Sequence, residues 1–173
     1  MTFYEKDLEQ IIYESDKDAL LERGLSVQGK LKRQLRIGNY GIADLVEIVR
    51  PIYVSPTGII QKGTITIYEL KKDNISVSTF MQAVGYAKGI SRYLELRDKS
   101  HFFNIEIVLI GKNIDVSGEF VFLTDLFEYK ECCLYSGSEM NLFVNFYTYD
   151  YNIDGMSFNK IEGYRKINEG FML

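Results

Sequence analysis

The chain has 173 residues, of which 46% are hydrophobic and 25% are charged, and its formal net charge is −4. These values are typical of one globular domain with a buried core, so we expect residues 1–173 to form a single domain. No apolar run is long enough to cross a bilayer and no signal pattern opens the chain, so we expect a cytoplasmic protein with no membrane partner.

The first predicted element is a helix over residues 2 to about 22. Thr2 and Glu5 form a capping-box pattern at its start. Apolar residues then recur at helical spacing, and Gly24 is placed to end the helix.

Three extended segments follow, over residues 25–36, 42–49 and 63–71. A Gly-Asn-Tyr-Gly turn separates the first two. Pro51 stops the second, and residues 50–63 form a longer excursion before the third. These segments can pair as an antiparallel meander.

A second helix is predicted from a cap at Ser76 or Ser78 to about residue 98. A buried strand over residues 103–111 comes next. The helix would be the crossover connection between the third strand and this one. The order helix, three strands, helix, strand predicts an α/β fold with a mixed central sheet flanked by helices.

The C-terminal third is rich in aromatic residues and less regular. Residues 120–123 and 142–149 are typical of strands, and Asp154-Gly155 marks a turn before further extended chain. We expect this added β part to extend the sheet, form a dimer surface or stack bases, with core packing as the plainest use of most rings.

Charged residues interrupt two of the apolar strands. Glu69 and Lys71 are two apart, so they point to the same face as Ile65 and Ile67. Asp44 interrupts the apolar run 42–46 one strand earlier. A charge on a buried strand face costs free energy unless it is paired or metal-bound. An exposed ion pair explains a lone Glu-x-Lys, but Asp44 beside it favours a site that binds Mg²⁺ or Mn²⁺.

Gln82 and Tyr86 are four residues apart on the second predicted helix and therefore share a face. Gly85 and Gly89 lie near that face. Glycine inside a helix costs about 1 kcal/mol relative to alanine, so the pair predicts close approach to the sheet or to a ligand. The alternative is simple helix packing with Gln82 and Tyr86 at the margin of the core.

A basic run in the first extended segment contains Lys30, Lys32, Arg33 and Arg36 and no acid. Such a strand is either a solvated surface or a rail for a nucleic-acid backbone. Side-chain alternation allows some of the four to face one groove.

The histidine and the cysteines of the chain do not indicate a metal site. His101 is the sole histidine, and we interpret it as a surface or capping residue. Cys132 and Cys133 are adjacent, which suits neither a structural disulfide nor a zinc site.

These motifs together resemble the PD-(D/E)XK nuclease superfamily, and most of all NucS-type endonucleases and RecB-like nuclease domains. The resemblance covers roughly residues 3–110. It is carried by Asp7-Leu8-Glu9, the basic strand 29–36, Gly41-Ile42-Ala43-Asp44-Leu45-Val46, Ile67-Tyr68-Glu69-Leu70-Lys71 and Gln82-Ala83-Val84-Gly85-Tyr86. It implies a restriction-endonuclease-like core over about residues 3–111, with a C-terminal extension over about 112–173.

The resemblance also implies a metal site. Asp44, Glu69 and the main-chain carbonyl of Leu70 would hold Mg²⁺ or Mn²⁺. The metal would polarise a phosphoryl oxygen and lower the pKa of a bound water. The implied activity is hydrolysis of DNA phosphodiester bonds, with an endonuclease as the preferred interpretation and an exonuclease as the alternative.

The remaining implied roles belong to side chains around the metal. Lys71 would orient the water or stabilise developing negative charge. Glu9 would join the outer sphere of the metal, and Gln82 and Tyr86 would help to place the nucleophile or the phosphate. The basic residues Lys30, Lys32, Arg33 and Arg36 would then contact the DNA backbone.

The chain is expected to differ from NucS in lacking a separate N-terminal DNA-binding domain and in its longer segment 50–63. Two alternatives therefore stay open. One is a non-catalytic module that binds nucleic acid or protein. The other is a nuclease that depends on a partner subunit or on a homodimer for DNA affinity.

Overall fold

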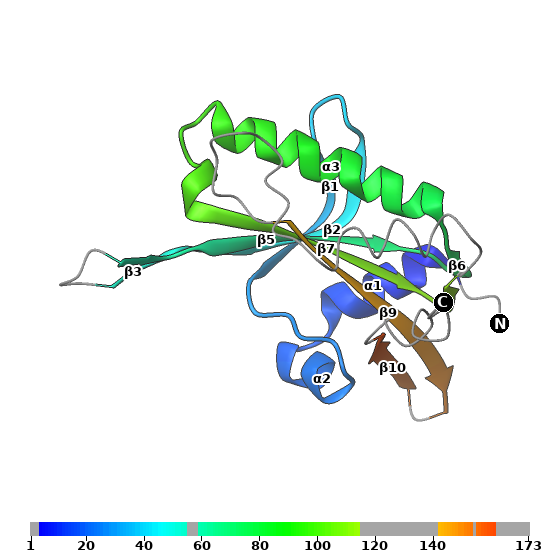
Figure 1. The fold of residues 1–173 in the computed structure, drawn as a ribbon. Coiled ribbons are helices and arrows are strands. Elements are labelled where there is room, and N and C mark those ends of the chain that lie inside the picture. The colour runs from blue at the N-terminus through cyan, green and yellow to red at the C-terminus, as the bar shows by residue number, and fades with distance from the viewer. Residues whose placement is uncertain (1–3, 55–58, 115–141, 154, 162–173) are drawn as a thin grey trace, which may run out of the picture.

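The computed structural model describes residues 4–54, 59–114, 142–153 and 155–161. Its main sheet contains strands β1 (Lys30–Arg36), β2 (Ile42–Val49), β5 (Gly63–Leu70), β7 (Phe103–Gly111), β9 (Leu142–Asn152) and β10 (Gly155–Lys160). The strands lie side by side in the order β1-β2-β5-β7-β9-β10, and Figure 1 shows helices on both faces. The predicted α/β class with a mixed central sheet is confirmed.

Strand pairing follows the predicted connections. β1, β2 and β5 pair antiparallel, so the predicted meander is confirmed. Helix α3 (Val77–Glu95) then crosses over, and β7 pairs parallel to β5. The C-terminal part extends the same sheet, since β9 pairs parallel to β7 and β10 pairs antiparallel to β9.

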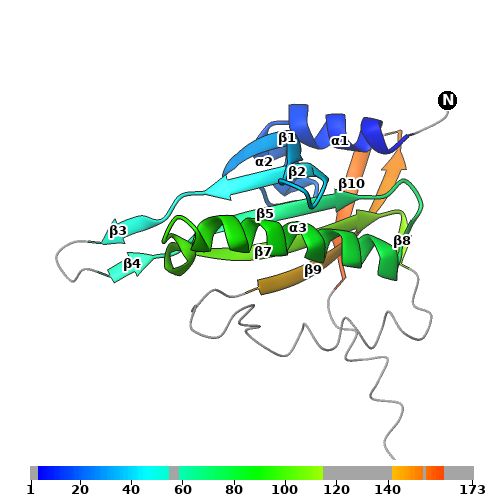
Figure 2. The same cartoon turned by 90° about the horizontal axis from the view of Figure 1, so that it is seen from above.

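Two cores lie on opposite faces of the sheet. The α3-side core packs α3 residues such as Phe80 against strand residues such as Ile67 and Leu109. The α1-side core packs helices α1 (Glu5–Glu14) and α2 (Lys17–Glu22) against the other face. Figure 2 shows α3 and the α1–α2 pair on different sides of the strands. None of the described helices is long and apolar enough to cross a membrane.

The predicted first helix is wrong in one respect, because the chain folds as two helices. Ser15 and Asp16 between them have extended backbones, and Ser15 Oγ donates a hydrogen bond to the carbonyl of Ile11 at 2.6 Å. A serine hydroxyl that bonds the preceding turn competes with the helix ladder. The start also differs, since the N–H of Tyr4 donates to Asp7 Oδ2 at 2.8 Å, while Thr2 lies outside the described residues.

Other boundaries also differ from the predictions. The first strand begins at Lys30 rather than near residue 25, and α3 ends at Glu95 rather than near 98. The excursion 50–63 contains an unpredicted hairpin of β3 (Ile52–Val54) and β4 (Ile59–Gln61). Figures 1 and 2 show this hairpin projecting beyond the sheet. It follows the C-terminal end of β2, whereas Asp44 lies near the start of that strand.

Three short elements complete the described secondary structure. Strands β6 (Asn74–Ile75) and β8 (Asn113–Ile114) pair parallel, and a short 3₁₀ turn, η1 (Ser100–Phe102), leads into β7. The predicted strand 120–123 and the Asp154 half of the predicted turn lie outside the described residues.

Side-chain alternation is interrupted at one point of β1 and β2. Leu31 packs against the α1-side core and Leu35 against the α3-side core, although regular alternation would put residues four apart on one face. On β2, Ala43 belongs to the α3-side core and Leu45 to the α1-side core. Gln34 lies between the first pair, in the left-handed region with φ 47°, and Asp44 lies between the second.

The two glycines of α3 have different environments. A Cβ at Gly89 would lie 2.6 Å from Ile37 Cγ2 and 2.7 Å from Tyr40 Cδ2, so Gly89 allows the β1–β2 turn to rest on the helix. A Cβ at Gly85 would meet nothing within 4 Å. The expected close approach to the protein's own structure is therefore present at Gly89 and absent at Gly85.

We expect Gly85→Ala to stabilise the fold by about 1 kcal/mol, because alanine restrains the unfolded chain and favours the helix. Gly89→Ala should be less stable than Gly85→Ala by about 1–3 kcal/mol, because its Cβ displaces Ile37 and Tyr40. Denaturant unfolding of both variants measures the difference. Equal stabilities would contradict the packing role of Gly89.

Candidate active site

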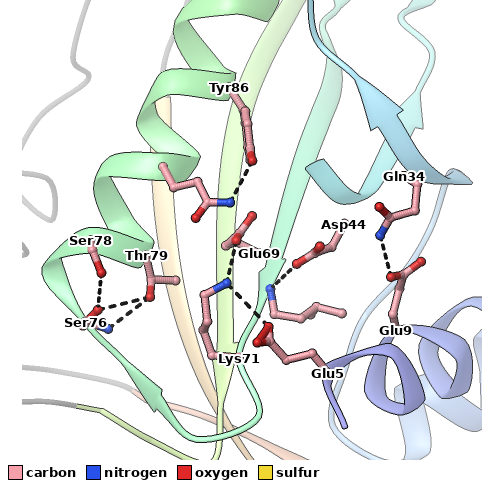
Figure 3. Close-up of polar contacts among 12 residues, drawn as sticks. Glu5, Glu9, Gln34, Asp44, Glu69, Lys71, Ser76, Ser78, Thr79 and Tyr86 are labelled. Atoms are coloured by element: carbon pink, nitrogen blue, oxygen red, sulfur yellow. Dashed lines mark hydrogen bonds and ion pairs between the residues drawn. The ribbon is translucent and has the colours of Figure 1, made fainter. Parts of the chain in front are cut away.

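The site is built where the sheet opens around Asp44. The β2–β5 ladder ends at the pair Leu45–Tyr68, and the β1–β2 ladder pairs residues on either side of Asp44 without including it. In place of a ladder bond, the N–H of Leu70 donates to Asp44 Oδ2 at 3.0 Å. Figure 3 shows the Asp44 carboxylate in this gap, on the side of Glu69 and Lys71.

Glu69 is the buried centre of the site. Its side chain is 1% exposed and lies beneath α3, and Lys71 Nζ donates to its Oε1 at 2.8 Å. Its other oxygen, Oε2, is buried and has no hydrogen-bond partner. An exposed ion pair at a strand edge is thus excluded for Glu69 and Lys71.

Both carboxylates are harder to ionise than in water. Burial raises the pKa of Glu69 to about 7, and the charge of Asp44 adds to this, while the hydrogen bond from Lys71 opposes it. Burial also raises the pKa of Asp44, against the opposing hydrogen bond from Leu70. The charge of Asp44 disfavours a second negative charge on Glu69, so the site favours a cation or a proton near the two carboxylates.

Lys71 remains a cation in this environment. Burial alone would lower its pKa, but the hydrogen bond and charge of Glu69, with the charges of Glu5 and Asp44, outweigh burial and raise it. Glu5 Oε2 lies 3.6 Å from Lys71 Nζ. The ammonium is therefore positioned to neutralise negative charge rather than to accept a proton.

Helix α3 supplies two further polar groups above the strands. Gln82 Nε2 donates to the Tyr86 hydroxyl at 2.8 Å. Figure 3 shows the Tyr86 side chain pointing from α3 toward Glu69. Burial raises the pKa of Tyr86, to which the charges of Glu69 and Asp44 contribute. The structure thus brings Gln82 and Tyr86 together with Asp44, Glu69 and Lys71.

Glu9 occupies the other side of the opening and is engaged by its neighbours. Arg33 Nε donates to its Oε1 at 2.5 Å, and Gln34 Nε2 donates to its Oε2 at 2.6 Å. Its charge still acts on Asp44, whose pKa it raises. Glu9 therefore lies near the carboxylates with both of its oxygens hydrogen-bonded, and an outer-sphere role stays a prediction.

The basic run is divided between the two faces of the sheet. Arg33 faces α1, where it pairs with Glu9 and lies 5.7 Å from the Tyr13 ring centroid. Lys32 and Arg36 border a cleft on the α3 side. Lys30 is exposed. A continuous rail of all four residues is therefore not formed.

Several polar residues near the site were not predicted from the sequence. Glu5 joins Lys71, and Gln34 holds Glu9. Glu47 is buried on the α1 side, where it accepts the N–H groups of Gln28 and Gly29 and the hydroxyl of Tyr68. An acid within an apolar strand was the available signal for Glu47, as for Asp44. Because three donors bond its carboxylate, we interpret Glu47 as a residue that stabilises the fold.

The remaining candidates lie elsewhere. His101 is exposed in η1 with its ring against Phe102, which agrees with a surface residue. Cys132 and Cys133 lie outside the described residues. Within the described ranges, no three His, Cys, Asp or Glu side chains group as metal ligands. Asp44 and Glu69 are the two acids that converge at the opening, and the ligand role of the Leu70 carbonyl stays a prediction.

In comparisons with known proteins, no family model, curated protein or solved structure matched the chain.

The raised pKa of Glu69 predicts a pH-dependent stability in the absence of divalent cations. The folded protein holds the Glu69 proton up to about pH 7, whereas the unfolded chain loses it near pH 4.5. Stability from this group is full below pH 4.5 and falls as pH rises through about 7, by about 3 kcal/mol. Denaturant unfolding in EDTA measures the slope, and Glu69→Gln should remove this component. An unchanged slope in Glu69→Gln would refute it.

Proposed function

We propose that this protein is a Mg²⁺- or Mn²⁺-dependent nuclease that hydrolyses DNA phosphodiester bonds, with a restriction-endonuclease-like core. One observation carries the proposal: the buried Oε2 of Glu69 has no partner, yet it lies in a site shared with Asp44 and Lys71. A buried, unpartnered carboxylate oxygen costs free energy unless a cation or proton joins it. Its place beside Asp44, just past the point where the β2–β5 ladder ends, favours a functional reason for that cost.

The donor set fits a hard divalent cation. Asp44 and Glu69 offer oxygen ligands, the kind that Mg²⁺ and Mn²⁺ prefer, and Mg²⁺ commonly uses one or two carboxylates and keeps several waters. When bound, the metal would polarise a phosphoryl oxygen and activate a water. Two converging carboxylates with raised pKa values support such a cation because it would offset their repulsion.

The neighbouring side chains supply binding and charge stabilisation. Lys71 stays an ammonium and would stabilise negative charge that develops on the phosphoryl oxygens. The Gln82–Tyr86 pair offers hydrogen bonds above the carboxylates. Open space beside Gly85 would let a phosphate approach this part of α3. Each group would bind or orient the substrate around the scissile bond.

Two neighbouring lysines provide a matched test of this proposal. We expect Lys71→Ala to lower DNA cleavage by about 10²–10³-fold, the usual cost of removing one group that stabilises transition-state charge. Lys72→Ala should retain activity, because the Lys72 ammonium pairs with the exposed Asp73. The Tyr149 hydroxyl donates to the main-chain carbonyl of Lys72, which alanine keeps. Cleavage of labelled single-stranded, duplex and branched DNA with Mg²⁺ or Mn²⁺ measures both.

Circular dichroism and unfolding curves would show that both lysine variants are folded. If wild-type protein cleaves none of these DNAs with either metal, the enzymatic proposal fails and the fold serves as a binding module. Equal losses in the two variants would remove the assigned role of Lys71.

Metal binding can be tested apart from cleavage. We expect Mg²⁺ or Mn²⁺ to raise the thermal midpoint of the wild-type protein, since a ligand that binds the folded state at 100 times its Kd stabilises it by about 2.7 kcal/mol. Asp44→Asn should abolish this rise. Asp73→Asn, a substitution at an exposed acid close in sequence to Lys71, should keep it. The same metal response in Asp44→Asn and wild type would contradict a site at Asp44.

A further inference from the structure

A second feature lies beside the candidate active site. A cleft of about 500 Å³ opens between the C-terminal half of α3 and strands β1, β2 and β5. Its floor is apolar and includes Leu35, Val46, Ile48, Ile65 and Ile90. This volume is within the range of ligand sites, about 300–1,000 Å³.

The rim of the cleft is cationic. Lys32 and Arg36 border it from β1, and Arg92 borders it from α3. Among the described residues that line it, none is acidic. This concentration of positive charge contrasts with the net charge of −4 of the chain. Charge complementarity therefore selects an anionic occupant.

Two tyrosines add flat apolar surface to the same rim. Tyr93 is 56% exposed and Tyr40 is 38% exposed. Tyr40 is held against α3 at Gly89, and the Arg97 guanidinium lies 5.0 Å from the Tyr93 ring centroid. Aromatic rings beside cations are the combination that binds single-stranded nucleic acid, since bases stack on rings while cations follow the phosphates.

The cleft lies within reach of a strand bound at the candidate active site. Tyr86 and Arg92 are six residues apart on α3, about 9 Å along its axis. Asp44 and Ile48 are four residues apart on β2, about 13 Å. At about 3.4 Å between stacked nucleotides of one strand, these separations correspond to three or four nucleotides.

We propose that the cleft binds an unpaired segment of the nucleic-acid strand that is cleaved a few nucleotides away, an inference that rests on the proposed nuclease function. In a duplex both faces of a base are stacked and its edge is paired, so Tyr40 and Tyr93 cannot reach it. An unpaired base exposes its face and can enter the apolar cleft while its phosphates meet Lys32, Arg36 and Arg92. The cleft thus assigns a preference for substrates with a single-stranded segment.

Fluorescence anisotropy in EDTA tests this without any cleavage, with one labelled oligonucleotide offered as a single strand and as its duplex. We expect the single strand to bind about tenfold more tightly or better. Tyr93→Ala should weaken single-strand binding by about 5- to 100-fold, while Tyr151→Ala, at an exposed tyrosine of the β9–β10 hairpin, should leave it unchanged.

Charge reversal on the two edge strands gives a second matched pair. Arg36→Glu on β1 should weaken binding tenfold or more, whereas Lys160→Glu, the same kind of change on the opposite edge strand β10, should have little effect. The combined substitution of Lys32, Arg36 and Arg92 by alanine should also lower the slope of log K against log salt by about 2, or about 0.7 for each lost phosphate contact.

The results separate this inference from the proposed function. Equal affinity for the single strand and the duplex, or equal effects of each variant and its control, would overturn the cleft assignment even if the protein cleaves DNA. Binding of an acidic peptide at the cleft, with no binding of either oligonucleotide, would overturn it as well. Single-strand binding that depends on Tyr93 and Arg36 would support it, even if no cleavage is found and the catalytic proposal fails.

Discussion

The hydrogen bond from the Leu70 N–H to Asp44 Oδ2 is the interaction on which the site depends. A ladder bond at this position would keep β2 and β5 paired. The Asp44 carboxylate would then be surrounded by apolar side chains with no backbone N–H to bond. By accepting the N–H itself, Asp44 satisfies the backbone group that the missing ladder bond would leave without a partner. The strands can then separate while the hydrogen-bonding capacity of Leu70 N–H is still met.

At Gln34 and Asp44, the alternation of side chains between the two faces of the sheet reverses on both β1 and β2. Leu31 and Leu35 face different cores, and so do Ala43 and Leu45. Gln34 absorbs the reversal in a left-handed conformation, which costs about 1–3 kcal/mol for a residue other than glycine. Its hydrogen bond to Glu9 helps to hold it there. Glu9, which Gln34 contacts, acts in turn on the charge of Asp44, so the strained backbone and the unpartnered Oε2 of Glu69 belong to one connected group of side chains.

Much of the architecture could be predicted because its signals are local. β2 and β7 have the bounds that turn residues and β-branched runs indicate, and the long helix between β5 and β7 requires a parallel crossover. The shared face of Glu69 and Ile67 follows from alternation within one strand. The coupling of Gln82 and Tyr86 follows from helical spacing, and their hydrogen bond agrees with it.

The features that the sequence did not predict are those decided by tertiary contacts. Nothing local to Gln34 marks a left-handed residue, because its conformation follows from the opening at Asp44. The helix break at Ser15 is accompanied by a hydrogen bond from the Ser15 hydroxyl to Ile11, and a serine hydroxyl can equally face solvent. The pairing of Arg33 with Glu9 joins residues 24 apart, so neither the basic run nor the acidic helix reveals it. Local spacing predicted the candidate site residues, whereas their hydrogen-bond partners could be found only from the fold.

The fold separates the basic residues of β1, which are close together in the sequence, into two different environments. Arg33 is neutralised by Glu9 on the α1 side, where Glu5 also lies near Lys71. Lys32 and Arg36 border a cleft whose described lining contains no acid. Acids therefore gather around the opening that would hold a cation, and cations gather along the neighbouring cleft that would hold an anion. A chain with a net charge of −4 can attract a polyanion in this arrangement, because potentials act locally and a Debye length of about 8 Å screens more distant charges at physiological ionic strength.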